Sequence, residues 1–337
     1  MLSRVIVMVV TLAAAVTAAS VGEEATAAAA AAESNRDSKF LPVMQIITFE
    51  NGPCEASSGE HGTCYSQKEC DGLGGAASGT CANGFGVCCV LQVTCDGWSE
   101  QNGSYFVNHA YPPPPPPPRH VYGGITPPTG TCQILLEFED FDMVGPLRGD
   151  CTNDTFVVLG ANQGSNIPTL CGINTGQHMY LDIDNSDGPF KLVSTMSAFN
   201  YMRRWKIKVT FIDEKHPCKT PFRCLQYFTE PTGAFSSFNF GGSPSQMLNG
   251  QMYSICFGYV PGYCDIGINY NRYDLGNING DCGNDYTANA GDKLCGDFLT
   301  TTSQLNATGP ISLTVFTDDN NEREEEGFSA AYMMMAC

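Results

Sequence analysis

Alternation of apolar and polar residues is the clearest pattern in the chain, and it predicts strands. Every second residue of 204–211 is large and apolar: Trp205, Ile207, Val209 and Phe211. Residues 132–141 and 311–316 show the same period of two, which is typical of a half-buried strand, and 327–332 returns toward the C-terminus as a further strand. Beyond the N-terminus, no segment combines a sustained helical period with helix caps. The sequence therefore predicts an all-β chain.

The N-terminal residues have the pattern of a secretory signal peptide. Arg4 lies in a short cationic start, residues 5–16 are apolar, and small residues follow. We expect residues 1–20 to be this signal and the protein to be secreted and extracellular. A membrane anchor is the alternative, but the apolar run is short, and no other run approaches the ~18 apolar residues of a membrane span. Residues 21–48 are Ala-rich and of low complexity, as in a linker.

Cysteine usage indicates an oxidising compartment. The chain has 17 cysteines in 337 residues, far more than a protein with reduced thiols needs. Six of them fall in residues 49–93, among glycine-rich turns: Cys54, Cys64, Cys70, Cys81, Cys88 and Cys89. So short a segment has little hydrophobic core, so we expect disulfides to stabilise it. Zinc is disfavoured because the segment has no Cys-x-x-Cys pair.

A long internal repeat divides the rest of the chain. Gly-Asp-Cys-x-Asn-Asp begins at Gly149 and again at Gly280, and in both places Leu-Cys-Gly follows, at Leu170 and Leu294. A period of this length fits two related domains rather than a solenoid. We place them at residues 95–214 and 218–337.

Two family resemblances attach to these segments. The run from Gly62 to Cys70, with the closing Cys88-Cys89, resembles clip domains of arthropod extracellular proteases. That resemblance implies the pairs Cys54–Cys88, Cys64–Cys81 and Cys70–Cys89. The interval from Cys70 to Cys81 is shorter than in most clip domains.

The tandem segments are similar to CUB domains. The shared features are Phe-x-x-Phe-Asp at 138–142, Cys-x-x-Asp at 151–154 and 282–285, and Phe-Thr-Asp at 316–318 before Gly-Phe-x-Ala-Ala-Tyr at 327–332. This resemblance implies two tandem jelly-roll β-sandwiches. It also implies four bridges: Cys95–Cys132, Cys151–Cys171, Cys224–Cys256 and Cys282–Cys295. Of Cys218, Cys264 and Cys337, two can tie the ends of the second domain, and the choice is open. The cysteine count is odd, so one cysteine stays unpaired or bonds to another chain.

Many CUB domains bind calcium and through it engage a partner's lysine. The resemblance implies Asp285, Asp318 and Asn320 as calcium ligands in the second domain, oxygen donors of the kind the ion prefers. Gly276 stands where the family has a glutamate, which weakens the site. In the first domain only Asp154 remains, with Val144 at the glutamate position, so calcium is not expected there.

Other motifs concern modification and charge. The triplets at Asn102, Asn153 and Asn306 are N-glycosylation acceptors in a secreted protein. A formal charge of −18 argues against nucleic acid and anionic membranes as partners. The cationic run 203–206 is either a patch for an acidic ligand or, more simply, the solvated face of a strand.

The sequence favours a non-catalytic protein. It has no Gly-Asp-Ser-Gly-Gly or His-Glu-x-x-His motif, and its five histidines are scattered; we expect His178 to be structural. A secreted arthropod-type protein that binds extracellular proteins is the favoured function. The alternatives are a non-catalytic regulator of a clip-protease cascade in innate immunity and a structural component of cuticle or matrix, with the odd cysteine as a cross-link.

Overall fold

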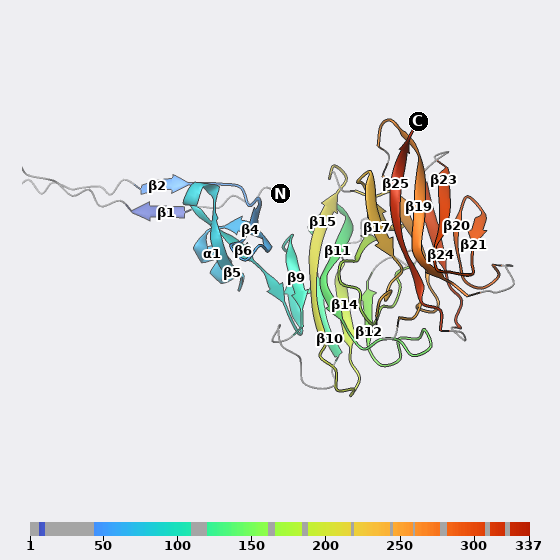
Figure 1. Cartoon of the computed structure of the whole chain (residues 1–337). Coiled ribbons are helices and arrows are strands. Elements are labelled where there is room, and N and C mark those ends of the chain that lie inside the picture. Colours follow the sequence, from blue (N-terminus) through green and yellow to red (C-terminus); the bar gives the residue numbers. More distant parts are fainter. Residues whose placement is uncertain are drawn as a thin grey trace, which may run out of the picture. The chain divides into compact units, whose positions relative to one another are not determined.

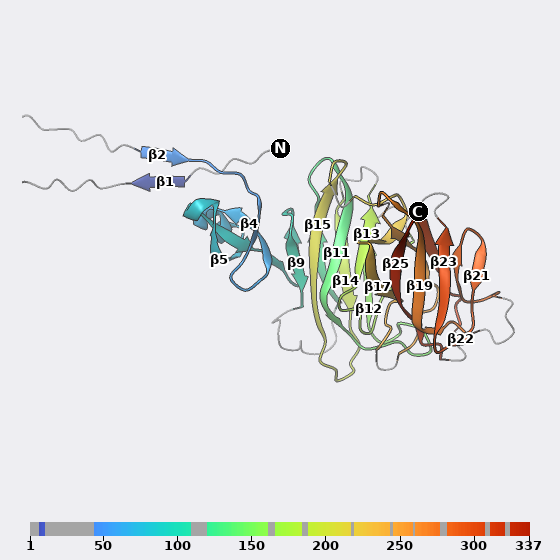
Figure 2. The same ribbon diagram turned by 45° about the horizontal axis from the view of Figure 1, so that its top comes forward.

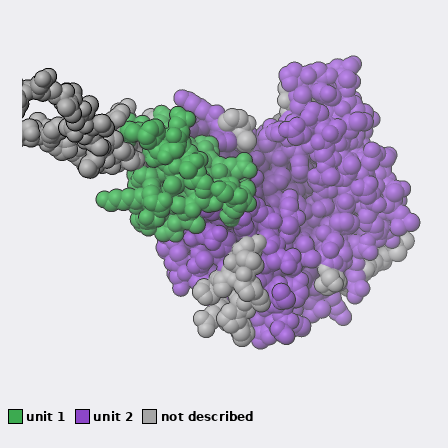
Figure 3. All heavy atoms as spheres, turned by 60° about the vertical axis from the view of Figure 1, so that its left-hand side comes forward, with its two compact units in different colours: residues 1–89 green, residues 90–337 purple. Residues whose placement is uncertain are grey.

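The computed structural model describes residues 7–10, 44–108, 120–160, 166–183, 188–216, 219–242, 245–258, 260–276, 282–306, 311–320 and 324–337. Most of the expected signal peptide and linker lie outside these ranges, as does Cys218. The protein is nearly all-β, as the alternation predicts (Figures 1 and 2). It divides into two compact units, Met1–Cys89 and Val90–Cys337 (Figure 3).

Three disulfide bonds stabilise the first unit. β1 (Val7–Val10) pairs with β2 (Met44–Ile47), and a separate sheet has the order β3 (Pro53–Glu55), β4 (His61–Tyr65), β6 (Gly86–Val90), β5 (Ala76–Cys81). The bridges Cys54–Cys88, Cys64–Cys81 and Cys70–Cys89 are the pairs that the resemblance implied. Position 86 requires glycine, because a Cβ there would lie 2.8 Å from the sulfurs of Cys64 and Cys81.

One short helix in this unit was not anticipated. α1 (Gln67–Gly72) begins after Ser66, whose side chain accepts a hydrogen bond from Glu69 N, while the Glu69 carboxylate accepts one from Ser66 N. This is a capping box, readable in the sequence as Ser-x-x-Glu. A 3₁₀ turn, η1 (Ala82–Gly84), follows β5.

The second unit contains two β-sandwiches. In the first sandwich, one sheet has the order β12 (Thr155–Leu159), β14 (Phe190–Thr195), β10 (His120–Ile125), β8 (Gly97–Ser99). The sheet packed against it has the order β13 (His178–Asp182), β11 (Thr131–Asp142), β15 (Arg204–Asp213), β9 (Ser104–Val107), β7 (Gln92–Val93). β7 pairs with β9, so this sandwich begins within the segment that we assigned to the cysteine-rich module.

The second sandwich repeats that topology. One sheet has the order β16 (Cys224–Phe228), β18 (Met252–Phe257), β24 (Ile311–Phe316), β20 (Tyr286–Asn289), β21 (Asp292–Leu294). The other has the order β17 (Thr232–Ser236), β25 (Gly327–Ala336), β19 (Tyr263–Asp274), β22 (Asp297–Phe298), and β23 (Thr301–Asn306) also pairs with β19.

The register shows how closely the two sandwiches correspond. Against β15, β11 has irregularities at Thr131/Gln133 and Phe138/Asp140. Against β25, β19 has them at Tyr263/Asp265 and Tyr270/Arg272, each 132 positions later. β8 and β16 are the parallel neighbours of β10 and β18. Equivalent residues can therefore be assigned strand by strand.

This equivalence corrects one predicted disulfide. Cys151–Cys171, Cys224–Cys256 and Cys282–Cys295 form as implied, and Cys264 bonds to Cys337. Cys95 and Cys132 are both thiols, so the Cys95–Cys132 bridge is wrong.

The reason is that the two cysteines correspond to halves of two different bridges. By register, Cys95 matches Cys224, and the place of its partner Cys256 is taken by Gly124. A Cβ at Gly124 would lie only 2.1 Å from Cε3 of Trp98. Cys132 matches Cys264, and the counterpart of Cys337 is Glu214.

The alternation of apolar and polar residues along the strands places the apolar side chains in the cores of the sandwiches. Trp205, Ile207 and Val209 of β15 are at most 1% exposed. On the opposite face of this strand, Lys206 pairs with Glu139 and Lys208 with Glu137. Lys206 and Lys208 thus lie on the partly solvated face of a strand, the simpler of the two interpretations of the cationic run. A continuous cluster of buried apolar side chains extends through both sandwiches.

The sandwiches meet along two sheet edges, β13 and β16. His178 Nε2 accepts a hydrogen bond from Tyr227 N at 3.0 Å. Gln133 exchanges side-chain and backbone hydrogen bonds with Thr220, both at 2.9 Å. Asn239 N donates to Asn174 Oδ1 at 2.8 Å; this link and the Gln133–Thr220 link are buried, and the His178–Tyr227 link is partly buried. Each sandwich therefore covers an edge of the other that would otherwise have unpaired backbone groups.

Candidate functional site

The internal repeat places one aspartate at the same point of each sandwich. Asp154 and Asp285 each lie three residues after a disulfide cysteine and immediately before a strand, β12 or β20. The bridges Cys151–Cys171 and Cys282–Cys295 fix the two loops. Both side chains are buried, with Asp154 0% and Asp285 7% exposed. A buried carboxylate needs either a counter-charge or several hydrogen bonds, and the two sandwiches differ in how they meet this need.

In the first sandwich an arginine neutralises the aspartate. Arg203 Nε lies 2.5 Å from Asp154 Oδ2, and Arg203 Nη2 lies 3.0 Å from Oδ1, which makes a bidentate ion pair. Asp154 also accepts hydrogen bonds from Val144 N at 2.9 Å, Ser197 N at 2.9 Å and Ser197 Oγ at 3.1 Å. The Arg203 side chain is only 3% exposed.

The same guanidinium shapes the loop between β14 and β15. Arg203 Nη1 donates to the carbonyl oxygens of Phe199 at 2.9 Å and Tyr201 at 3.4 Å, and Nη2 donates to Ser197 O at 3.2 Å. Phe199 and Met202 of this loop are more than 60% exposed. One buried cation thus holds a loop whose apolar side chains face solvent.

The second sandwich has no such cation among the described contacts of Asp285. Asp285 Oδ1 accepts a hydrogen bond from Asp318 N at 2.8 Å. The pKa of Asp285 is raised to about 6: burial is the largest cause, the hydrogen bond from Asp318 N opposes it, and the charges of Asp318 and Glu325 add to it. Glu325 is itself 7% exposed. Two like charges, those of Asp318 and Glu325, therefore act on Asp285, where Asp154 has a guanidinium.

Glu325 also occupies the space at Gly276, the position where the family has a glutamate. A Cβ on Gly276 would lie 2.5 Å from Glu325 Oε1. A carboxylate from a residue near the start of β25 therefore lies beside position 276. The sequence does not reveal this contact, because the two residues are far apart in the chain.

The strand register shows that the charge is reversed between the sandwiches. Arg204 pairs with Asp142 across β15 and β11, and Gly327 pairs with Asp274 across β25 and β19. By this register, Arg203 is the counterpart of Glu326. The same reversal affects β11 and β19, where Asp140 is the counterpart of Arg272.

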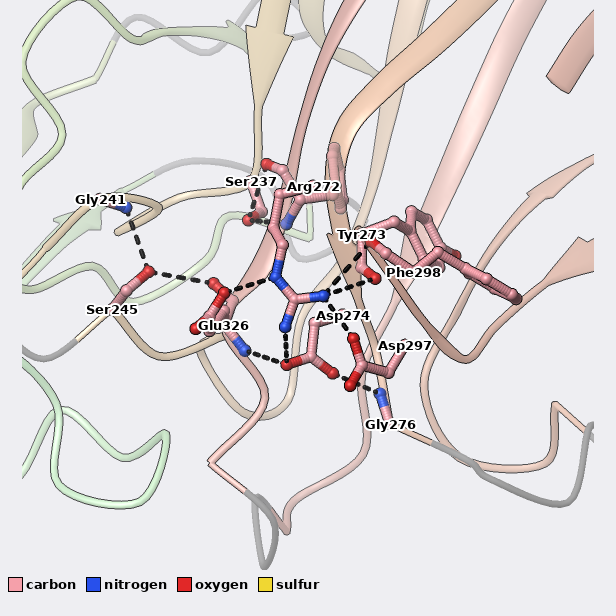
Figure 4. Close-up of polar contacts among 11 residues, drawn as sticks. Ser237, Gly241, Ser245, Arg272, Tyr273, Asp274, Gly276, Asp297, Phe298 and Glu326 are labelled. Carbon is pink, nitrogen blue, oxygen red and sulfur yellow. Dashed lines mark hydrogen bonds and ion pairs between the residues drawn. The ribbon is translucent and has the colours of Figure 1, made fainter. Parts of the chain in front are cut away.

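Arg272 lies among several carboxylates at this end of the second sandwich (Figure 4). Its guanidinium contacts Glu326 at 2.6 Å, Asp274 at 3.0 Å and also Asp297. Partial burial lowers the pKa of Arg272, but the hydrogen bonds to Asp297 and Glu326 outweigh it, so the net pKa is raised. Three carboxylates share the Arg272 guanidinium, and Asp285, Asp318 and Glu325 lie beside them. The other cation among the described residues here is Lys293, which donates to Cys282 O at 3.2 Å, so negative groups outnumber positive ones among the described residues of this end.

The predicted calcium ligands form only part of a site. Asp318 lies at Asp285, and Asp318 Oδ1 accepts a hydrogen bond from Asn320 N at 2.8 Å. These oxygen donors are of the type that calcium uses. Within the described ranges, however, no three acidic, histidine or cysteine side chains form a group that could hold a metal ion. Calcium binding by Asp285, Asp318 and Asn320 therefore stays a prediction.

The glycosylation acceptors also remain predictions. Asn102 is exposed between β8 and β9, and its Oδ1 accepts a hydrogen bond from Phe211 N at 2.7 Å. Asn153 is half-buried beside Asp154. Asn306 ends β23, and the remainder of its triplet lies outside the described residues.

His178 and a nearby cavity lie where the sandwiches meet. Burial lowers the pKa of His178 to about 4, so the ring is neutral at pH 7 and accepts the Tyr227 hydrogen bond. A cavity of about 380 Å³ lies between Tyr180 and Asp182 of the first sandwich and Arg223 and Tyr253 of the second. His178 therefore takes part in the contact between the sandwiches, and its purely structural role stays a prediction.

Comparison with known proteins identifies one segment. Residues 221–284 match the family model described as the animal CUB domain. The chain therefore contains a CUB domain, located in the second sandwich. No curated protein matches the chain, and no helix in the described ranges is long and apolar enough to cross a membrane.

Solved structures that are similar include the following three. The CUB1-EGF-CUB2 domains of rat MASP-1 are 16% identical with a TM-score of 0.28, covering 72% of this chain and 99% of that one. The human MASP-1/3 CUB1-EGF-CUB2 domain is 17% identical with a TM-score of 0.27, covering 70% and 100%. The extracellular region of zebrafish Gpr126/Adgrg6 is 13% identical with a TM-score of 0.28, covering 71% and 35%.

Proposed function

We propose that this protein is secreted and non-catalytic and that it binds other extracellular proteins through its paired sandwiches. A CUB domain and seven disulfides fit an extracellular protein. The observation that carries the binding function is the excess of negative charge around Asp285. A buried carboxylate among like charges is stabilised when a cation approaches it.

The cation in this proposal belongs to the partner, as a lysine or arginine side chain, with or without a calcium ion between them. Asp318 and Asn320 would contribute oxygen ligands if calcium takes part. Phe298 and Leu299, which are 39% and 80% exposed at β22, provide apolar contact area beside Asp297. A basic and partly apolar protein surface therefore complements this end of the molecule.

A charge-matched capture experiment tests this function. The oxidised, secreted protein is immobilised and exposed to extracellular fluid, and the bound proteins are identified with and without a calcium chelator. Asp285→Asn is compared with Asp292→Asn, which removes one charge from an exposed residue of β21. We expect Asp285→Asn to abolish capture of a basic protein and Asp292→Asn to retain it. Equal capture by both variants would contradict the assignment of the site.

A second candidate function, the regulation of a clip-protease cascade, has its own support. The pairing of the six N-terminal cysteines is the one that clip domains have, and Leu73 and Phe85 of this unit are 42% and 47% exposed. This function predicts saturable binding of a protease zymogen that Leu73→Asp and Phe85→Asp weaken. Binding that these changes leave intact would favour the sandwiches, and retention of matrix components instead would favour the structural role.

A further inference from the structure

The Asp154–Arg203 pair lies at the one calcium-ligand position of CUB domains that the first sandwich retains. We infer that the Arg203 guanidinium is the built-in cation of the first sandwich. It replaces a metal ion at Asp154, so this sandwich neither binds calcium nor requires it. Dependence on an external cation is thereby confined to the second sandwich.

The hydrogen bonds of Asp154 show why no place is left for a metal. An ionised carboxylate offers about four lone-pair sites. Asp154 accepts five hydrogen bonds, two on Oδ2 and three on Oδ1. A calcium ion would have to break several of these bonds and enter beside a guanidinium of the same sign of charge.

Arg203 is as fully engaged as its partner. Its Nε, Nη1 and Nη2 donate to Asp154 and to oxygens of Ser197, Phe199 and Tyr201. An arginine in a fixed, bidentate geometry loses little further entropy in holding these contacts, since its planar fork is pre-organised. Arg203 is also part of the chain, directly before β15. Its presence at Asp154 therefore does not depend on the concentration of a dissolved ion.

The reversal of charge between the sandwiches is an independent argument. The counterpart of Arg203 is Glu326, and Glu325 raises the pKa of Asp285. The same aspartate thus has a cation in one sandwich and anions in the other. If the ion pair served packing alone, the second sandwich would need one as well. Its aspartate, however, has no cation among its described contacts.

Direct cation binding to the full chain tests the inference. Terbium luminescence, with calcium competition, is measured for Asp285→Asn and for the double variant Asp154→Asn/Asp285→Asn. We expect no specific, calcium-competed signal from Asp285→Asn, because Asp154 is occupied by Arg203. A signal from Asp285→Asn that disappears in the double variant would overturn the inference.

Variants of Arg203 provide a readout that does not use a metal. Arg203→Ala should lower the unfolding temperature by on the order of 10 °C, since it leaves a buried carboxylate without its counter-ion. Millimolar methylguanidinium should recover part of that loss in Arg203→Ala and have no such effect on the native chain, with urea as the uncharged control. Arg203→Gln removes the charge at similar size. If Arg203→Gln keeps the native unfolding temperature, the charge is not needed and the inference is wrong.

Discussion

Asp154 and Asp285 are equivalent in position, yet we expect their replacement by asparagine to change stability in opposite directions. Asp154→Asn leaves Arg203 buried with no counter-ion, and breaking such a pair costs about 3–5 kcal/mol. Asp285→Asn removes a charge that burial and the neighbouring Asp318 and Glu325 disfavour. It should therefore stabilise the protein when no cation is bound.

The magnitude for Asp285 follows from its pKa. A folded pKa of about 6 against the ordinary 3.8 corresponds to at most about 3 kcal/mol of penalty at pH 7. Relaxation of the surroundings reduces the penalty of a buried charge, so we expect about 1–2 kcal/mol. The folded state holds this proton more tightly than the unfolded state. The wild type therefore loses stability as pH rises from about 4 to 6, and Asp285→Asn does not.

Calorimetric unfolding in the presence of a chelator, from pH 4 to 8, measures both effects. The fluorescence of Trp98 and Trp205, the chain's two tryptophans, reports on the first sandwich. Asp285→Asn should be more stable than the wild type above pH 6 and equally stable near pH 4. Asp154→Asn should be less stable than the wild type at pH 7. If both variants are destabilised equally, the two aspartates have the same electrostatic environment and our reasoning fails.

Three further predictions concern other parts of the molecule. Because the folded pKa of His178 is lowered to about 4, its contribution to stability should be lost as pH falls from about 6.5 toward 4; His178→Gln keeps an acceptor for Tyr227 and should flatten that slope in thermal melts. Gly124→Ala should destabilise the first sandwich by about 1–3 kcal/mol through overlap with Trp98, while Gly72→Ala, which has open space, should be near neutral in denaturant titrations. Peptide mapping of the alkylated, non-reduced protein should recover Cys264 linked to Cys337 and no peptide linking Cys95 to Cys132; a Cys95–Cys132 peptide would contradict the fold.

Sequence patterns predicted the elements of the fold because strand burial has a strict period. Trp205, Ile207 and Val209 face the core as alternation requires. Arg203 has the same period of two and is also buried. This burial was not predicted from the sequence, because Arg203 lies in a cationic run. The sequence shows four positive or aromatic residues in a row, but only the register separates the buried guanidinium from its exposed neighbour Arg204.

The candidate site was less predictable because it depends on contacts distant in sequence. Asp285 and Asp318 were identified from the motif, and the structure brings them together. Glu325 could not be identified in this way, since its carboxylate reaches the space at Gly276 from the segment before β25. The Cys95–Cys132 bridge failed for the same kind of reason: both cysteines lie at reasonable sequence positions, but they correspond to halves of different bridges.

The buried seam between β13 and β16 has a consequence for avidity. Two domains on a flexible linker search for their second contact, and the linker length sets the effective concentration of that contact. Here Gln133, His178 and Asn174 hold the sandwiches together through buried or partly buried hydrogen bonds. Contact sites on the two sandwiches therefore have a fixed separation. A bivalent partner that matches this spacing gains its second contact with little further loss of entropy, and a partner that does not match it gains none.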